Sequence, residues 1–189
     1  TTAILELVLQ LAARGKRALL CASTHVAVDN VIERIKDPSN TLRNSVLVVR
    51  IGKEKAVRSE LAREYCLERM AKTESRDLRE QLNRLPMRSA SQEMLREALQ
   101  PPKGQERWEQ TLFDCAQLVC GTTIGILQHP ALKLSTVPFD YLVLDEASKT
   151  TFSEFLVPAL RAKRWIIVGD RRQLSPYVDE EWIASGVAA

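Results

Sequence analysis

The sequence predicts an α/β domain with a mainly parallel sheet and a long helical insertion. Short, wholly apolar runs are typical of buried strands, and segments with apolar residues at helical spacing stand between them. Strands that alternate with helices need crossover connections, which favours a parallel sheet. A long stretch dense in Arg, Glu, Gln and Leu separates two groups of such elements. The 189 residues of the chain are enough for one domain with a sizeable core.

The first part of the domain is expected to cover residues 1–52. Ile4, Val8 and Leu11 share one face of a helix, and Gly15 stands where a helix C-cap would be. Short apolar runs, with a second helical pattern between them, follow this helix. The expected elements in this part are a helix over 2–14, a strand over 18–22, a helix over 26–36 and a strand over 46–51.

The helical insertion is expected to cover residues 53–117. Leu78, Leu82 and Leu85 recur at helical spacing, and a Pro-Pro-Lys-Gly turn at 101–104 breaks the pattern. We interpret the segment as an antiparallel hairpin of helices that projects from the sheet. Two roles stay open for it, because its basic residues can serve as a solvated surface or can contact a nucleic-acid backbone.

The second part of the domain is expected to cover residues 118–189, where the alternation of strands and helices returns. In parallel sheets the ligand site lies beyond the carboxyl ends of the strands, so the residues that follow each strand are the candidates for function. The expected elements in this part are strands over 118–121, 141–144 and 165–168, and a helix over 153–161.

The composition argues against several classes of protein. No apolar run approaches the roughly 20 residues that a membrane helix needs, so no membrane partner is expected. The four cysteines form no C-x-x-C pair and the chain has two histidines, which disfavours a zinc site. The net charge of +3 is compatible with nucleic-acid binding without arguing for it. We expect a reduced, intracellular protein, cytoplasmic in a bacterium and nuclear or cytoplasmic in a eukaryote.

Two adjacent acids follow the strand expected at 141–144. Asp145 and Glu146 reach the sheet edge together, an arrangement that phosphoryl-transfer ATPases need. One carboxylate can hold Mg²⁺, and the next can orient the water that attacks the γ-phosphate of ATP. A solvent-exposed turn or a helix N-cap formed by acids remains the alternative.

The strand expected at 165–168 is followed by Gly169, Asp170 and, three residues later, Gln173. A Gly-Asp turn lets the backbone come close to a bound phosphate, and Gln173 can donate a hydrogen bond to the γ-phosphate. An ordinary turn would explain this segment taken alone. Its position on the strand after the acidic pair favours a shared nucleotide site.

Small polar residues follow two further strands. Ser23, Thr24 and His25 open the helix after the strand at 18–22, and Thr122 and Thr123 follow the strand at 118–121. Hydroxyls and free backbone N–H groups at a helix N-terminus suit a phosphate, here one in a nucleic-acid backbone. Each segment taken singly can also be a simple N-cap or turn.

Together these segments resemble the superfamily 1B helicases of the up-frameshift and senataxin type. Residues 22–29 are similar to motif Ia of that family, and residues 120–123 resemble its Thr-bearing motif. Residues 145–148 match the Walker B motif, and residues 169–176 match the G-D-x-x-Q-L-x-P pattern of motif III. The resemblance implies the first RecA-like domain of such a helicase, a P-loop NTPase three-layer sandwich that uses ATP and Mg²⁺ and moves along single-stranded DNA or RNA.

The resemblance also implies a role for each motif residue. Asp145 would help to hold Mg²⁺, Glu146 would activate water and Gln173 would contact the γ-phosphate. The nucleic-acid backbone would lie near five residues, which are Ser23, Thr24, His25, Thr122 and Thr123. The nucleotide would lie near seven, which are Thr1, Thr2, Asp145, Glu146, Gly169, Asp170 and Gln173.

Two parts of the family pattern are absent from the sequence. The glycines and lysine of the phosphate-binding loop would precede Thr1, which falls where the Mg²⁺-binding hydroxyl residue of that loop belongs. The second RecA-like domain, which supplies arginine fingers to the site, would be a partner within the same parent chain. Two alternatives to a helicase fragment stay open, a catalytically inactive helicase-derived binding module and, less compatible with motif III, an unrelated P-loop ATPase.

The 189-residue chain alone is predicted not to hydrolyse ATP, because the lysine and the arginine fingers would be missing. Phosphate release from the purified chain is the measurement. Turnover above background that disappears in Glu146→Gln would contradict the prediction.

Overall fold

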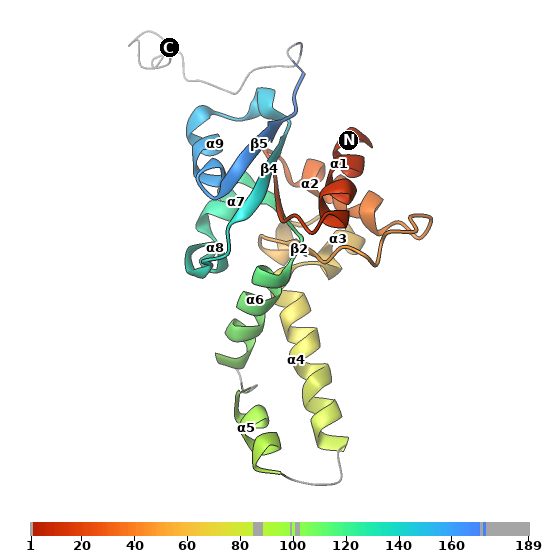
Figure 1. Cartoon of the computed structure of the whole chain (residues 1–189), viewed down its shortest axis with the longest axis vertical. Helices are drawn as coiled ribbons and strands as arrows, with labels where there is room; N and C mark the ends of the chain where they lie inside the picture. The colour runs from red at the N-terminus through yellow and green to blue at the C-terminus, as the bar shows by residue number, and fades with distance from the viewer. Residues whose placement is uncertain (1, 85–88, 99, 101–102, 171, 173–189) are drawn as a thin grey trace.

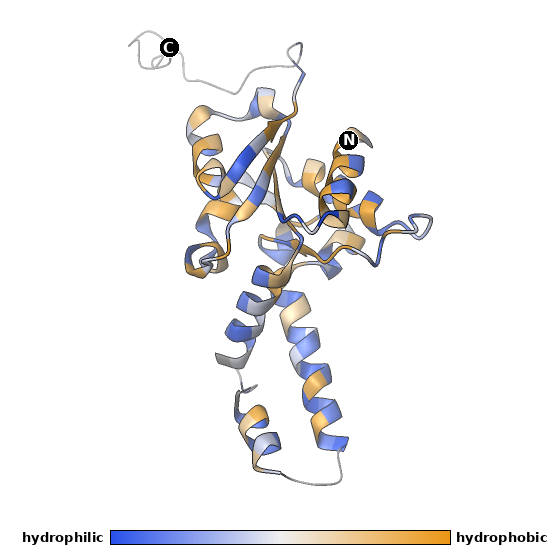
Figure 2. Ribbon diagram, in the orientation of Figure 1, coloured by the Kyte–Doolittle hydropathy of each residue, from blue (hydrophilic) through white to orange (hydrophobic). Residues whose placement is uncertain are grey.

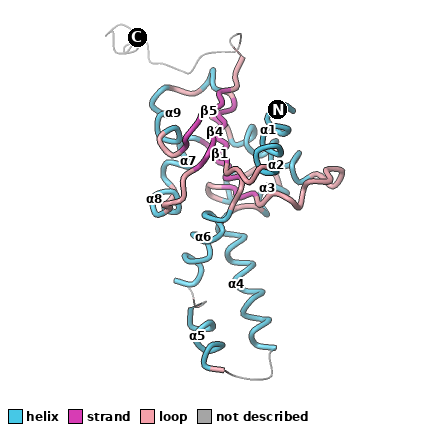
Figure 3. Tube along the Cα trace, in the orientation of Figure 1, coloured by secondary structure: helices cyan, strands magenta, loops and turns pink. Residues whose placement is uncertain are grey.

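The computed structural model describes residues 2–84, 89–98, 100, 103–170 and 172. Within them, a five-stranded sheet has the order β2-β3-β1-β4-β5, and every pair of neighbours is parallel (Figure 3). The predicted α/β fold class is therefore confirmed. The strands are β1 (Ala18–Ala22), β2 (Val48–Arg50), β3 (Leu118–Thr122), β4 (Phe139–Asp145) and β5 (Ala162–Ile167).

Helices connect the strands and cover both faces of the sheet (Figure 1). The α-helices are α1 (Thr2–Ala13), α2 (His25–Lys36), α3 (Glu60–Glu64), α4 (Leu67–Arg84), α5 (Ala90–Ala98), α6 (Lys103–Cys115), α7 (Thr123–Gln128), α8 (Pro130–Leu134) and α9 (Phe152–Ala159). Two single-turn 3-10 helices are η1 (Glu54–Ala56) and η2 (Ala147–Lys149). No helix in the described part of the chain is both long enough and apolar enough to cross a membrane.

The two faces of the sheet build two separate apolar cores, because side chains alternate along each strand. In β1, Leu20 points into the core beneath α1, α2 and α3, whereas Leu19 and Cys21 point into the core beneath α7, α8 and α9. All five residues of β1 are buried. The result is a three-layer sandwich, in which apolar residues of the helices pack against both faces of the sheet. Figure 2 shows apolar and polar residues mixed along these helices.

Several predicted elements differ from the structure at their ends. The strand expected at 46–51 is shorter at both ends. The N–H of Leu47 bonds the Gln117 side chain at 2.6 Å, and Gly52 turns the chain with a φ of 135° directly after Ile51. Gly15 has a φ of 65° and ends α1 as expected for a C-cap glycine. The short helices α7 and α8 were not predicted, since each spans fewer than two full turns of sequence pattern.

The insertion contains an antiparallel pair of helices that projects from the sheet (Figure 1). Helix α4 runs away from the body and α6 returns beside it, with α5 at the far end. Residues 53–66 behave differently, since Val57, Ala62 and Cys66 are buried in the core beneath α1 and α2. The boundary at residue 53 stays a prediction, and the helices that leave the body begin at Leu67.

Arg17 holds the root of this projecting pair against the sheet. Its guanidinium donates hydrogen bonds to the carbonyl oxygens of Ala116 at 3.0 Å, Val137 at 2.8 Å, and Phe113. It also lies 4.0 Å from the centroid of the Phe139 ring and 5.3 Å from that of Phe113. Burial lowers the pKa of Arg17, against the opposing effect of nearby acidic groups.

Arg17→Leu is expected to lower the free energy of unfolding by about 2–4 kcal/mol, because three carbonyl groups lose their donor. Urea denaturation measures the change. The matched control is Arg164→Leu, which removes an exposed arginine that bonds the Tyr141 hydroxyl at 3.0 Å. That variant should change stability by less than about 0.5 kcal/mol. Equal losses in the two variants would show that Arg17 has no special role.

Candidate functional site

The register of the sheet brings the predicted site segments to one edge. Ala22, the last residue of β1, lies opposite Thr122 of β3 on one side and Asp145 of β4 on the other. The polar residues that follow these strands therefore emerge side by side at the carboxyl edge. The sequence predicts each of them directly after a strand, and the strand order makes them neighbours.

The carboxylate of Glu146 binds side chains from two of the loops at this edge. Its Oε2 accepts hydrogen bonds from Ser23 Oγ and Thr24 Oγ1, both at 3.1 Å, and its Oε1 lies 3.0 Å from Lys149 Nζ. Its backbone N–H donates to Asp145 Oδ1 at 2.8 Å. The Walker B-like glutamate thus contacts the two hydroxyls that sequence analysis assigned to nucleic-acid binding.

Glu146 also adopts an unusual backbone conformation. Its φ of 53° and ψ of 39° lie in the left-handed region, and it is the non-glycine residue with positive φ among those described. This conformation costs an ordinary L-residue about 1–2 kcal/mol. Strain of this kind persists where surrounding contacts hold it, and it is frequent at functional sites.

The surroundings of Glu146 keep its carboxylate ionised. Burial raises its pKa, but hydrogen bonds from Lys149, Ser23 and Thr24, with the positive charge of Lys149, outweigh burial and lower the pKa overall. A pKa below that of an ordinary glutamate leaves the group negatively charged at neutral pH. The carboxylate therefore has the ionised state that a general base needs, and the hydrogen bonds that lower its pKa also reduce its basicity.

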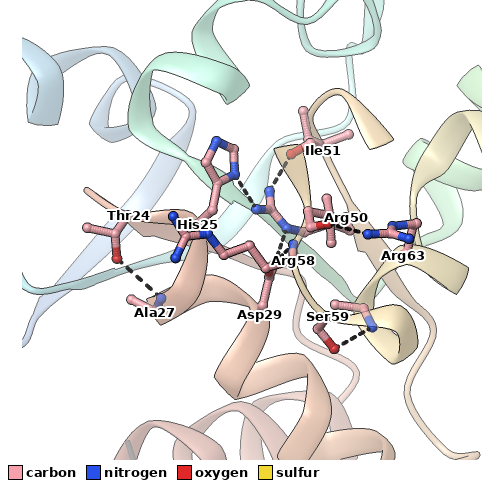
Figure 4. A network of polar contacts seen from close by, with 11 residues as sticks. Thr24, His25, Ala27, Asp29, Arg50, Ile51, Arg58, Ser59 and Arg63 are labelled. Atoms are coloured by element: carbon pink, nitrogen blue, oxygen red, sulfur yellow. Dashed lines mark hydrogen bonds and ion pairs between the residues drawn. The ribbon is translucent and has the colours of Figure 1, made fainter. Parts of the chain in front are cut away.

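Two of the candidate hydroxyls also cap helices. Thr24 Oγ1 accepts from the backbone N–H of Ala27 at 3.2 Å at the start of α2, as Figure 4 shows, and Thr122 Oγ1 accepts from that of Gly125 at 3.1 Å at the start of α7. The N-cap interpretation thus holds for both. Capping uses their lone pairs, so the hydroxyl hydrogens remain for donation, as Thr24 does toward Glu146.

An open cleft lies in front of these residues. All five residues that were predicted to contact nucleic acid line it, together with three basic side chains that sequence analysis missed, Lys53, Arg58 and Lys149. Among the described lining residues, Glu146 alone is acidic. Single basic residues carry no spacing signal in the sequence, so only the fold could bring these three together.

A second, smaller hollow adjoins the cleft and shares Glu146 with it. Asp145, Gly169 and Asp170 line it, as do Thr24 and Glu146, which line both hollows. A Cβ atom on Gly169 would come within 3.1 Å of the backbone nitrogen of Ser148. The glycine of motif III therefore permits close approach to the segment after β4.

Among the other predicted residues, Thr2, Thr1 and Gln173 lie elsewhere or cannot be located, whereas Thr123 lines the cleft. Thr2 begins α1, and its Oγ1 accepts a hydrogen bond from Arg34 Nη1 at 3.2 Å, in the last turn of α2. Thr123 is buried beside Thr122 at the start of α7. Thr1 and Gln173 lie outside the described residues.

Asp145 is the described residue best suited to a hard divalent cation. Its carboxylate ends β4 in the smaller hollow, and only Oδ1 has a hydrogen-bond partner among the described residues. Mg²⁺ prefers one or two carboxylates and takes the rest of its ligands from water and phosphate, so this site fits it. No group of three or more metal-binding side chains occurs in the part of the chain that the structure describes.

Comparison with known protein families gives one match that runs along most of the chain. The family model described as "AAA domain" matches residues 1–102 and 68–181. These two overlapping segments include both polar loops of the cleft and the segments that line the smaller hollow.

Curated relatives match nearly the whole chain at low identity. The chain is 27% identical over 93% of its length to DNA-binding protein SMUBP-2 of Mesocricetus auratus. It is 28% identical over 94% of its length to the DNA replication ATP-dependent helicase/nuclease dna2 of Schizosaccharomyces pombe. It is 28% identical over 87% of its length to a Regulator of nonsense transcripts 1 homolog of Drosophila melanogaster. The chain spans only 19%, 10% and 13% of the length of these proteins.

Glu146→Gly is expected to be more stable than Glu146→Ala by about 1 kcal/mol, because glycine adopts positive φ without strain. Both variants lose the same carboxylate contacts, so their difference isolates the backbone. Urea denaturation of the two proteins is the measurement. At Lys149, whose φ is not positive, the order should reverse and alanine should be the more stable. The same order at both positions would rule out backbone strain at Glu146.

Proposed function

This chain belongs to the AAA domain family and is related to the superfamily 1 helicases, and we propose that it forms part of an ATP-driven motor. The motor would couple hydrolysis of Mg-ATP to movement along single-stranded DNA or RNA. The chain would be part of its first RecA-like domain, inside the cell. Its relatives are named for DNA binding and for ATP-dependent helicase activity, and both would apply to the motor.

One observation carries the proposal, which is that Glu146 lines both hollows. Its Oε2 accepts from Ser23 and Thr24, which line the basic cleft, and its neighbour Asp145 lines the smaller hollow. A residue that touches both sites can report the occupancy of one to the other. A motor needs such a link, because hydrolysis must respond to the track.

On the nucleotide side, Asp145 and Thr1 would hold Mg²⁺, which when bound neutralises charge on the phosphates. Glu146 would accept the proton of the attacking water, since its carboxylate is ionised. Gly169 and Asp170 line the same hollow. We further propose that the nucleotide site extends to Thr2 and to Gln173, the latter against the γ-phosphate.

On the nucleic-acid side, the hydroxyls of Ser23, Thr24 and Thr122, with the N-terminus of α7 at Thr123, would bind backbone phosphates. The basic lining supports a polyanion, and contacts of this kind do not depend on base sequence. A phosphate that accepts from Ser23 and Thr24 would compete with Glu146 for the same hydrogens. Binding of the track would therefore free the carboxylate for water, and nucleic acid would then stimulate hydrolysis.

The ATPase test uses the chain joined to the two parts that the resemblance implies, a phosphate-binding loop and a second motor domain. Oligothymidylate or oligouridylate should stimulate phosphate release. Glu146→Gln should lower the stimulated rate by about 100-fold or more, the usual contribution of a general base. Glu60→Gln, at an exposed glutamate that pairs with Arg63, is the matched control and should leave the rate unchanged.

Two further variants test the coupling in the same assay. Ser23→Ala should lower the ratio of stimulated to unstimulated rates by about fivefold, the effect of one hydrogen bond. Thr24→Ser keeps its hydroxyl and should keep the ratio. A rate of phosphate release that is the same with and without nucleic acid would contradict the coupling. No hydrolysis under any condition would instead support an inactive binding module.

A further inference from the structure

A buried network connects α2 to the end of β2 behind the cleft (Figure 4). The side chain of Arg50 is fully buried, and its Nε donates to Asp29 Oδ1 at 3.0 Å. Its Nη1 donates to the carbonyl oxygen of Ile51, and its Nη2 lies 2.9 Å from His25 Nδ1. All three nitrogens of the guanidinium are thus engaged, each by a different partner.

The partners of Arg50 are themselves fixed in place. His25 and Asp29 stand four residues apart on α2, so both side chains lie on the helix face that meets Arg50. The second oxygen of Asp29 accepts from the backbone N–H of Arg58 at 3.2 Å. Gly52 turns the chain directly beyond β2 with a φ of 135°, next to the buried guanidinium. The network therefore has little freedom to rearrange.

The chemistry of the network determines the protonation of His25. A guanidinium has only N–H donors, so His25 Nδ1 must accept and cannot carry a proton. The proton of the neutral ring is then on Nε2. Burial lowers the pKa of His25, as do the charges of Arg50 and Arg58, against an opposing effect of Asp29. Both arguments lead to an uncharged ring at neutral pH.

The second ring nitrogen of His25 points away from Arg50 (Figure 4), and His25 lines the basic cleft. We propose that Arg50, anchored by Asp29, is a positioning residue that fixes His25 as an uncharged Nε2–H donor to a phosphate oxygen of single-stranded nucleic acid. This inference rests on the proposed function for its ligand. It adds the buried ion pair of Arg50 and Asp29 to the residues that form the nucleic-acid site.

A neutral donor differs from a cation in a measurable way. Lys53, Arg58 and Lys149 attract phosphates over a distance, and each that contacts one releases counterions. His25 would add direction without charge, because a hydrogen bond needs a particular angle to the phosphate oxygen. Its removal should therefore weaken binding while the salt dependence of binding stays the same.

The first test reads the ring directly by long-range ¹H–¹⁵N correlation on the 189-residue chain. From about pH 6 to pH 8, His25 should show an unprotonated Nδ1 and a protonated Nε2. Titration with the pKa of an ordinary histidine, or a mixture of tautomers, would overturn the role of Arg50. Arg50→Met should release the ring to such a mixture, but it leaves a buried carboxylate unpaired and costs stability. The unaltered chain is therefore the primary measurement.

The second test measures binding of labelled oligothymidylate and oligouridylate by fluorescence anisotropy at several salt concentrations. His25→Ala should weaken binding by about fivefold with an unchanged salt slope. His25→Asn should restore affinity, because its amide oxygen can accept from Arg50 while its NH₂ group donates. Lys149→Gln should lower the salt slope by about one. The control is His129→Asn, at a histidine whose Nδ1 accepts from the backbone of Ala131 in the cap of α8.

The outcomes separate the inference from the proposed function. Binding by the unaltered chain that His25→Ala leaves intact would overturn the inference and spare the proposed motor. A fall in salt slope for His25→Ala would show that the ring binds as a cation, which also overturns it. No binding by the unaltered chain would contradict the proposed track and the ligand named here, while the ring measurement still decides the role of Arg50.

Discussion

Strand β1 pairs with β3 on one side and β4 on the other, and its register decides which loops meet. Ala22 ends β1 beside Thr122 and Asp145, so the loops that follow the three strands share one edge. A shift of one residue would turn Leu19 and Leu20 to the wrong faces and expose both cores. The burial that stabilises the sheet therefore also fixes the geometry of the site.

Polar groups at this edge serve the fold and the site together. Thr24 caps α2 and also holds the Glu146 carboxylate, and Arg50 closes a buried ion pair while it orients His25. The left-handed backbone of Glu146 is a cost of this arrangement. The hydrogen bonds around its side chain offset that cost.

Sequence patterns predicted the strands well where burial dominates. The all-apolar run 18–22 is β1 from end to end. A strand that is covered on both faces is apolar throughout, so its two ends are visible in the sequence. Residues 53–66 were grouped with the insertion by their polar composition, yet Val57 and Cys66 pack into the core. The three side chains of this segment that are buried, Val57, Ala62 and Cys66, give too weak a period to separate the body from the projecting helices. The site motifs were visible for a different reason, since each follows a strand.

The contacts within the site were beyond sequence reasoning. That Ser23 donates to Glu146 depends on the strand order, which places residues 123 positions apart within 3.1 Å. Arg50 stands in an apolar run and gave no functional signal, although an arginine inside a buried strand needs a partner. That need was the one available pointer to Asp29 and His25.

The projecting helices, here called the arm, leave the body at Leu67, directly after Cys66 bridges Arg50 at the end of β2, and the chain returns at β3, the neighbour of β2 in the sheet. Both of its ends are therefore already held side by side, whatever lies between them. Lengthening such a connection adds loop-closure entropy only slowly, and no strand has to change register to accommodate it. The arm is therefore an exchangeable insertion. Its replacement could change the binding partners of the domain while the residues at the carboxyl edge of the sheet stay the same.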